Sequence, residues 1–517
     1  MAEQQQARFF NMDPTTAADA RRNGCDPRAL DQAAESMLRY IYGNLPDLPA
    51  YDSARLAALA SSPDGVDRIG RLPPELLSKI VSGLPAVKDA ARTAVLSITT
   101  ISLYSNTLLP LAPGLALHAP RAGRLADAHL LPEGCGWPPA PTASSPAVTA
   151  AVSSVLEAHP GPFRCVHLVC TRMNARRAQL ARWLQLLAAK GVQDLVLVNR
   201  PWPRDVPLPA TLYTTVTTLT RLYLGMWKLP GTAALRGASF PHLRELGLGC
   251  VEMEQGVVDA LVARSPALET LNILGCKGLR LRLVSQSLSC LQISFSRMES
   301  IAVIAAGIST RLRIGDAPKL HAFGYLEPGQ VVKIRDTIIM PGIASASAVV
   351  TSVKVLSLNV CFGVRSDVQM VPTFLRCFPN AERLHIMSKR CAEPTGNYLT
   401  LNFWEESDPE KNLLSRIRVM SLSEFTGDPG EVGFLEFFFR NARALDNASI
   451  SMANPRFTPF SMEEAYAKVK RSSRIKASKS NMVVLGSTGP AGGKLWSLKD
   501  GTDFSFHDPF SVVEVVG

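Results

Sequence analysis

The sequence has 517 residues, 46% of them hydrophobic, and a formal net charge of +11. This length exceeds one compact core, so two or three modules are expected, and the mild positive charge permits an acidic partner without requiring one. No run of about 18 apolar residues occurs and the first residues lack an apolar targeting stretch, which argues against a membrane-spanning or secreted chain. We therefore expect a cytoplasmic or nuclear protein, or both, and reduced thiols for its ten scattered cysteines.

The N-terminal part of the chain is predicted to change character near residue 28. Residues 1–27 are polar and are expected to be disordered. Residues 28–43 repeat apolar side chains at helical spacing, so a helix is expected there, followed by a linker up to residue 66.

Residues 67–97 concentrate aliphatic side chains on one face of a short helix. Pro73 and Pro74 lie at its start, where a missing N–H is tolerated, and Gly83 and Pro85 end it. A second short helix is expected over residues 87–96. Two helices of this size cannot bury their aliphatic surface on each other, and each such side chain gains about 1.5–3 kcal/mol on burial. The segment therefore requires a partner or a neighbouring domain.

The sequence of this segment, DRIGRLPPELLSKIVSGLPAVKDAARTAVLS, resembles a plant F-box, and we assign the box to residues 67–110. The resemblance implies docking onto a Skp-type linker protein and, through it, onto a cullin. An ordinary amphipathic helix pair inside a helical domain is the alternative. The side chains expected to carry the docking are Leu72, Pro73, Leu76, Leu77, Ile80, Leu84 and Pro85.

Residues 98–124 depart from the F-box pattern. The family completes the box with a basic helix that contains Trp, whereas this chain continues ITTISLYSNTLLP, without Trp or an Arg pair. Loss of a large aromatic anchor typically costs about 3–5 kcal/mol. A degenerate box that no longer binds its linker protein is therefore an alternative. Residues 111–158, which include a stretch rich in Pro, Ala and Ser at 132–149, are expected to form a linker.

From residue 159 to residue 425 the pattern L-x-x-L-x-L recurs, with offsets of 24 and 25 residues between the copies at Leu219, Leu243 and Leu268. This period is the leucine-rich-repeat signature, in which neighbouring repeats stack and share one core. The copies start at Phe163, Val192, Leu219, Leu243, Leu268, Leu288, Leu320, Val353, Ala381 and Ile417. Only 32 residues separate the copies at Leu288 and Leu320, which suggests a missing repeat and a kink or gap near residues 304–316.

Helical patterns between the copies complete the fold prediction. Residues 251–265 and 172–190 each carry one apolar stripe, and Gly191 ends the second. We therefore expect an α/β fold: a short α-helical F-box, then a curved leucine-rich-repeat solenoid with parallel strands on the concave face and helices on the convex face, and finally a small C-terminal α/β cap. A plain α/β domain with leucine-rich strands is the alternative.

Side chains that alternate with the buried leucines are expected to point away from the core, onto the concave face. They mix aromatic, amide and both charged types, which suits a protein or peptide target better than nucleic acid. The residues expected to bind the target are Arg221, Tyr223, Glu245, Thr270, Asn272, Asn359, Arg383 and His385.

Residues 426–517 are expected to form the C-terminal cap. A basic helix is predicted over residues 462–480 and a last strand over residues 481–485. We expect residues 468–479 to form a basic helix that is exposed to solvent; a phosphate-binding patch is the alternative. With the repeats, this region and the segments HPGPFRCVHL (159–168) and DFSFHDPF (503–510) resemble grass proteins that end in an FBD region.

Catalytic and metal-binding patterns are not found. The eight histidines lack H-x-x-x-H and H-E-x-x-H spacing, and the loop at 486–494 misses the phosphate-loop register. We expect no enzyme activity, no metal and no cofactor, and neither a membrane nor a nucleic acid as partner. The predicted function, implied by the resemblance, is a substrate-recognition adaptor of a Skp–cullin–F-box (SCF) ubiquitin ligase that tethers a protein target for ubiquitination. A repeat scaffold or decoy with a non-functional box, a small-molecule or inositol-phosphate sensor and a nucleic-acid binder are the alternatives.

Overall fold

The computed structural model describes residues 14–45, 124–126, 146–159, 162–163, 165–169, 177–199, 206–276, 279–294, 311–327, 331–340, 348–389, 401–407, 412–455, 458–486 and 510. The predicted F-box, with its docking positions between residues 72 and 85, lies outside them. The chain divides into two compact units. Unit 1 is Met1–Leu243 with Val251–Met253, and unit 2 is Arg244–Cys250 with Glu254–Gly517.

Unit 1 contains a parallel sheet in the order β1 (Arg124–Ala126), β2 (Cys165–Leu168), β3 (Asp194–Val198) and β4 (Arg221–Gly225). Leu195 pairs with Leu222 and Leu197 pairs with Leu224 in the ladder between β3 and β4, and all four side chains are buried. The three repeat copies predicted in this unit are therefore strands, as expected, and their leucines form the core of the unit.

Helices of unit 1 follow the predicted pattern in part. Helix α9 (Arg177–Ala189) buries Leu180, Trp183, Leu184 and Leu187, and Gly191 after it has a φ of +62°, which is the left-handed conformation that commonly ends a helix. The short helix α10 (Thr211–Thr215) and the 3₁₀ helix η5 (Thr232–Leu235) follow β3 and β4.

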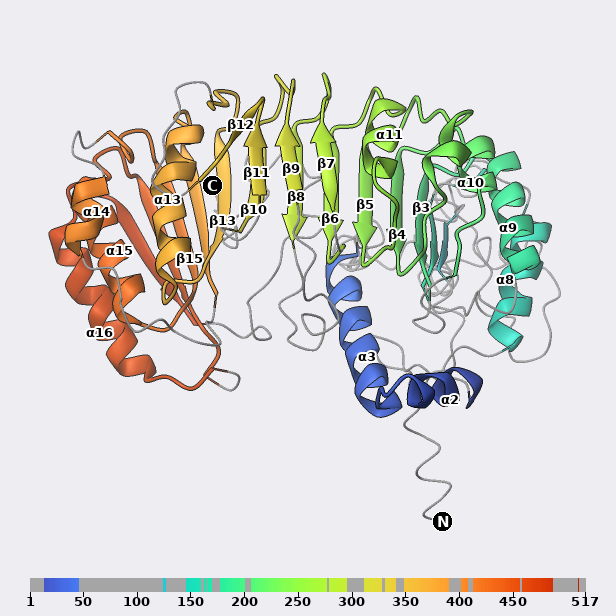
Figure 1. The fold of residues 1–517 in the computed structure, drawn as a ribbon, viewed down its shortest axis with the longest axis horizontal. Helices are drawn as coiled ribbons and strands as arrows, with labels where there is room; N and C mark the ends of the chain where they lie inside the picture. The colour runs from blue at the N-terminus through green and yellow to red at the C-terminus, as the bar shows by residue number, and fades with distance from the viewer. Residues whose placement is uncertain are drawn as a thin grey trace, which may run out of the picture. The chain divides into compact units, whose positions relative to one another are not determined.

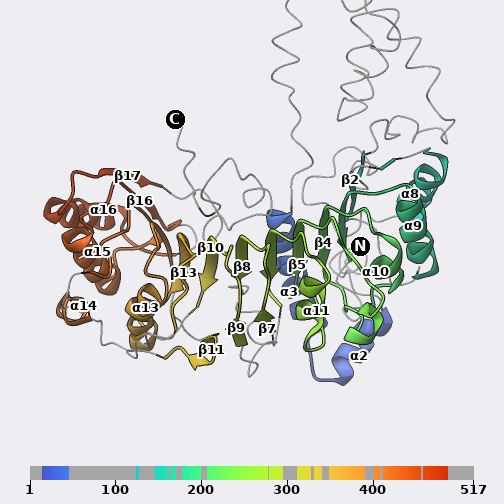
Figure 2. The ribbon, with the colours of Figure 1, turned by 90° about the horizontal axis from the view of Figure 1, so that it is seen from above.

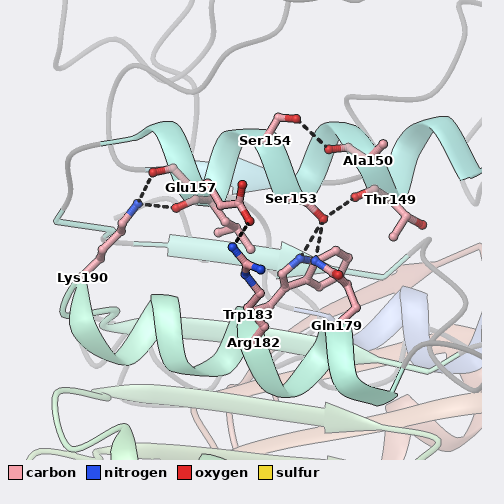
Figure 3. A network of polar contacts seen from close by, with 10 residues as sticks. Thr149, Ala150, Ser153, Ser154, Glu157, Gln179, Arg182, Trp183 and Lys190 are labelled. Atoms are coloured by element: carbon pink, nitrogen blue, oxygen red, sulfur yellow. Dashed lines mark hydrogen bonds and ion pairs between the residues drawn. The ribbon is translucent and has the colours of Figure 1, made fainter.

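The prediction of a linker over residues 111–158 is wrong for its last part, because α8 (Pro146–Ala158) is a helix packed on α9. The Ser153 hydroxyl accepts hydrogen bonds from Gln179 Nε2 at 2.8 Å and Trp183 Nε1 at 3.1 Å, as Figure 3 shows. Arg182 and Glu157 form an ion pair at 2.8 Å, and the Lys190 ammonium binds carbonyls at the end of α8. Alanine and valine in this segment favour a helix, and the polar bonds hold it in place.

Two N-terminal helices precede the repeats, α2 (Pro14–Arg22) and α3 (Pro27–Asn44). The expectation of disorder is wrong for α2, where alanines and an ion pair between Arg22 and Asp19 favour a helix. The helix expected over residues 28–43 is confirmed. A Cβ added at Gly225 would lie 3.3 Å from Cγ2 of Ile41, so α3 packs on the concave face of β4, opposite the leucine core.

Unit 2 continues the repeat pattern as a parallel sheet (Figure 1). Its strands are, in order, β5 (Glu245–Gly249), β6 (Thr270–Leu274), β8 (Cys290–Ser294), β10 (Ala322–Leu326), β13 (Val355–Val360), β14 (Arg383–Ser388), β15 (Val419–Phe425), β16 (Asn447–Met452) and β17 (Asn481–Leu485). Each repeat copy predicted in this unit forms a strand, and the predicted last strand is β17. The gap expected near residues 304–316 is wrong, because β8 and β10 are direct neighbours with Cys290 opposite Ala322.

A second sheet explains the irregular spacing. It contains β7 (Arg280–Leu283), β9 (Arg311–Ile314), β11 (Val331–Ile334) and β12 (Thr337–Ile338), with β7, β9 and β11 parallel and β12 antiparallel to β11. In Figure 2 the row β7, β9, β11 forms a layer separate from β8, β10 and β13. The expectation of helices on this side holds for α11 (Val257–Ala263) and α13 (Arg365–Cys377) but is wrong for the repeats between them. The alternating sequence R-L-R-L suits a strand that is buried on one face only.

The C-terminal part of unit 2 adds α14 (Leu401–Ser407), α15 (Pro429–Asn441), α16 (Met462–Ser472) and the 3₁₀ helix η6 (Ser473–Ile475). Trp404 is fully buried and stacks on Phe437, with their ring centroids 5.5 Å apart. Packing of this aromatic cluster joins α14 to α15.

The buried carboxylate of Glu431 fixes the start of α15. Its Oε2 accepts hydrogen bonds from the backbone N–H groups of Thr426, Gly427 and Asp428 at 2.8–3.0 Å, and from the Thr426 hydroxyl at 3.0 Å. The hydroxyl of Ser388, on β14, donates to the other oxygen. Burial raises the pKa of this carboxyl, and the hydrogen bonds from Ser388 and the backbone oppose that shift. The donors supply the partners that a buried carboxylate needs.

No helix among the described residues is long and apolar enough to cross a membrane. Cys276 and Cys290 are buried, and the Cys276 thiol donates to the Leu248 and Leu274 carbonyls. Cys361 is disulfide-bonded, so the expectation of reduced thiols throughout the chain is wrong at this position.

Candidate partner-binding face

The residues expected to bind a target lie, within each unit taken by itself, on the side of the strands opposite the leucine core, here called the concave face after the predicted fold. In unit 1, Arg221 and Tyr223 are on β4; Tyr223 is fully buried and Arg221 lies 3.9 Å from the Asp194 carboxylate. The remaining six residues, Glu245, Thr270, Asn272, Asn359, Arg383 and His385, are on β5, β6, β13 and β14 of unit 2.

Strand register in unit 2 arranges these side chains in rows. Thr270 lies opposite Glu245 on the neighbouring strand, and Asn272 lies opposite Gln292. Farther along the sheet, Ser357 lies opposite His385, which lies opposite Ser421. The row from Asn272 to Ser421 therefore carries amide, hydroxyl and imidazole groups along the concave face.

Most of this face is closed to solvent. Thr270, Asn272, Gln292 and Ser357 are fully buried, and His385 is only 4% exposed. The sequence pattern correctly separates these residues from the leucine core, but it does not reveal that they are covered. A target reaches them only if the covering part of the chain moves away.

Phe510 is one of the side chains that cover the face. Its ring centroid lies 5.4 Å from that of Tyr325 in an edge-to-face arrangement and 6.0 Å from the His385 ring. A Cβ at Gly324 would lie 3.1 Å from the Phe510 ring and 2.5 Å from Cβ of Ser357, so only glycine fits beneath the ring. Phe510 is 4% exposed and belongs to the DFSFHDPF segment.

The strand β10 has an irregular register next to this contact. The pairing of β10 with β13 shifts between Phe323 and Leu326, so that Leu326 rather than Tyr325 lies opposite Leu358. Such an irregularity turns a side chain from one face of the sheet to the other. The L-x-x-L-x-L pattern assigns Tyr325 to the core, and this is wrong, because Tyr325 contacts Phe510 on the concave face.

Several polar groups on the covered face lack hydrogen-bond partners among the described residues. Both polar side-chain atoms of Asn272 and of Gln292 are buried and unpaired, as are the hydroxyls of Thr270 and Ser357. Each such group typically costs about 1–3 kcal/mol when it is left unsatisfied. Asn359 is better satisfied, since its Nδ2 donates to Glu327 Oε1 at 3.0 Å. The covered face is thus polar at positions where stability alone favours apolar side chains.

The basic side chains of the C-terminal segment fall into two groups, those that bond the backbone and those that are exposed. Lys468 donates to the Gly427 carbonyl at 2.8 Å and Lys476 donates to the Ser480 carbonyl at 2.6 Å, so both have structural partners. Lys470, Arg471 and Arg474 are exposed. A polar cavity of about 590 Å³ lies where β16 and β17 begin, with Arg443, Asp446 and Lys479 among its lining residues. Asp446 already pairs with Arg418, so the cavity is not a ready-made anion site.

Sequence reasoning missed Gly324 and Phe510. A glycine inside a strand pattern was a usable signal for the first, because it marks a close approach. Within the described part of the chain, no three His, Cys, Asp or Glu side chains are grouped to hold a metal ion.

Comparison with known protein families finds a match for the repeats and another for the C-terminal region. Residues 180–386 match the model described as "FBD-associated F-box protein At5g56370, LRR repeats", and residues 405–450 match the FBD model. The search of individually curated proteins gave no match. The first range includes strands from β3 to β13 and the first part of β14, and the second includes α15. The chain therefore carries leucine-rich repeats of the type found in plant FBD-associated F-box proteins, followed by an FBD domain.

Proposed function

We propose that this chain is a substrate-recognition adaptor of an SCF-type ubiquitin ligase, acting in the cytoplasm or the nucleus. The observation that carries the proposal is the presence, in one chain, of an F-box-like segment at residues 67–97 and the repeat and FBD matches that follow it. F-box residues would hold a Skp-type linker protein and thereby a cullin. The repeats would hold a protein target.

In this function the chain does no chemistry. It holds the target beside a ubiquitin-charged carrier, and tethering raises the effective concentration of the target's lysines. The concave-face residues from Arg221 to His385 are the proposed target contacts. Because most of them are buried, target binding is expected to require displacement of the covering side chains, Phe510 among them.

The test is co-purification of the full-length chain with a Skp-type protein. Leu76→Asp places a charge on the apolar face of the box and is expected to abolish capture. Ser78→Asp, at a position off the apolar pattern, is the matched control and is expected to retain it. If the unchanged chain captures no more linker protein than the Leu76→Asp variant, the adaptor function is wrong.

A scaffold or decoy with a degenerate box is the second candidate. Residues 98–124 lack the expected Trp and Arg pair, and the two family matches do not extend to residues 67–97. Stable target binding without capture of the linker protein and without target ubiquitination would favour this function.

A further inference from the structure

The outer face of the second sheet carries a cluster of positive charges that the repeat and FBD matches do not explain. On β7, β9 and β11 every second side chain is buried, and the alternate ones point outward. The inward side chains are aliphatic. The outward ones, here called the basic sheet face, are Arg280, Arg282, Arg311, Arg313, Val331 and Lys333.

Strand register sets these cations side by side. Arg280 lies opposite Arg311, and Arg282 lies opposite Arg313. Lys333 of β11 extends the second row, because it lies opposite Arg313. Neighbouring strands are about 4.8 Å apart and alternate residues of one strand about 6.8 Å apart, so the charges form a small regular grid. Figure 1 shows β7, β9 and β11 next to one another.

Like charges directly opposite one another destabilise a sheet, so this grid needs compensation. Arg313 is compensated, since it pairs with Asp336 at 2.7 Å and bonds the Arg335 carbonyl. Arg280 only reaches the neutral Gln255 amide, at 2.9 Å. Arg311 and Lys333 make no side-chain hydrogen bond or ion pair with the described residues.

Acidic groups near the basic sheet face do not neutralise it. Asp259 accepts a hydrogen bond from the backbone N–H of Arg282 at 2.9 Å and is half-buried beside β7. Asp316 is bonded to Gln286 at 2.7 Å. The face keeps an excess of positive charge that is exposed to solvent at Arg280, Arg282 and Arg311.

Exposed aliphatic side chains border the cations. Val331 shares the face and is 36% exposed; Ile338, opposite Lys333 on β12, is 53% exposed, and Val284 after β7 is 47% exposed. None of the described side chains on this face is aromatic. Single-stranded nucleic acid is usually held by bases stacked on aromatic rings, so the face suits it poorly. A protein segment with acidic and aliphatic side chains complements both parts of the face.

We propose that the basic sheet face is a docking surface for an acidic, extended segment of a partner protein. The segment runs along the strands with carboxylates at alternate positions, because their spacing of about 6.8 Å matches that of Arg280 and Arg282. Aliphatic side chains that face the same way as the carboxylates, farther along the segment, contact Val331 and Ile338. This surface is separate from the covered concave face of the same repeats, and the proposal does not rest on the adaptor function.

Binding of a probe peptide to the full-length chain tests the proposal. The probe is a fluorescent peptide of about eight residues, Glu-Ser-Glu-Ser-Val-Ser-Val-Ser, which in extended form places its glutamates and valines on one side and spans the face. Its affinity is measured by anisotropy at low and at raised ionic strength, since exposed charges are screened by salt. The variant Arg280→Gln, Arg282→Gln, Arg311→Gln removes three exposed cations, and we expect about tenfold weaker binding from three modest exposed charge pairs.

A charge-matched control separates a site from general attraction. Lys470→Gln, Arg471→Gln, Arg474→Gln removes the same charge from exposed positions on and just after α16, and we expect its affinity to stay within about twofold of the unchanged chain. Equal unfolding midpoints for the three proteins show that none is misfolded.

Three outcomes with the peptide overturn the proposal: the peptide does not bind, both triple variants lose affinity equally, or the triple variant at Arg280, Arg282 and Arg311 binds it with unchanged affinity. A thymidine oligonucleotide is the competing probe. If it displaces the peptide and depends on the same arginines, the surface is a nucleic-acid site and the peptide proposal is wrong. Capture of the Skp-type protein is measured in parallel and is expected to be unaffected in both triple variants, so failure here is distinct from failure of the adaptor function.

Discussion

The concave face and the basic sheet face of unit 2 belong to the same repeats, yet their polar side chains have opposite environments. On the concave face, Asn272 and Gln292 are fully buried and have no hydrogen-bond partner in the part of the chain that the structure describes. On the basic sheet face, Arg280 and Arg311 are exposed and lie opposite each other. Both faces show the same alternation of polar and apolar residues.

The difference shows that alternation of polar and apolar residues along a strand identifies the side chains that point away from the leucine core. It does not identify which of these side chains are exposed to solvent. Segments distant in the sequence decide that, as Phe510 does where it covers Gly324 and His385. The basic sheet face is exposed to solvent. The concave face, which the repeat pattern predicts to bind a target, is largely buried.

Replacing Phe510 is expected to have the largest effect on this contrast. Phe510→Ala removes a buried ring and should lower the free energy of unfolding by about 3–5 kcal/mol, because the ring packs against Tyr325 and His385. Chemical denaturation measures the change. Tyr466→Ala removes an aromatic ring that is 53% exposed and should have little effect. Equal changes in the two variants would show that Phe510 does not cover the face.

A methyl group at position 324 is expected to separate the ring from the strand. Gly324→Ala puts Cβ 2.5 Å from Cβ of Ser357 and about 3 Å from the Phe510 ring, and overpacking of this kind costs about 1–3 kcal/mol. Gly237→Ala is the control, since a Cβ there meets nothing within 4 Å. Thermal unfolding compares the two. A stable Gly324→Ala variant would contradict the close approach.

An apolar side chain at position 292 should be tolerated or stabilising. Both polar atoms of Gln292 are buried and find no partner among the residues with a described structure, so Gln292→Met removes an unsatisfied amide and is expected to gain about 1 kcal/mol. Gln369→Met, at a half-buried position on α13, should give no such gain. A clear loss of stability on Gln292→Met would mean that this part of the concave face is open to water or holds a polar ligand.

The smallest effect on stability is expected on the basic sheet face. Exposed surface substitutions usually change the free energy of unfolding by less than about 0.5 kcal/mol, and removing like-charge repulsion favours the fold. The triple variant at Arg280, Arg282 and Arg311 should therefore unfold at the same denaturant concentration as the unchanged chain. A marked destabilisation would indicate that the charges are engaged within the fold and are not available to a partner.

Much of the fold follows from local sequence pattern. The leucines of each repeat copy specify strands because their alternation suits a buried, parallel ladder, and Gly191 ends α9 as its left-handed φ requires. The R-L-R-L and R-L-R-I segments also alternate, but a search for the longer leucine pattern passes over four-residue strands. Alpha-helix α8 was mistaken for a linker because alanine and serine are common in both.

The candidate sites were only partly predictable. Arg221 to His385 were correctly separated from the core, since that depends on alternation alone. The burial of His385 was not predictable, because Phe510, which packs against it, lies 125 residues farther along the sequence. The pairing of Arg280 with Arg311 likewise depends on register between strands that are separated by other elements.

The hydrogen bonds of Glu431 have a practical meaning for anyone who shortens this chain. The carboxylate joins the first turn of α15 to Ser388 on a strand that the sequence assigned to the repeats. A cut at the expected module boundary, between residues 425 and 426, would put Ser388 on one fragment and Glu431 on the other. It would also separate Trp404 from Phe437, which stacks on it. The repeats and the FBD segment are better expressed as one inseparable piece.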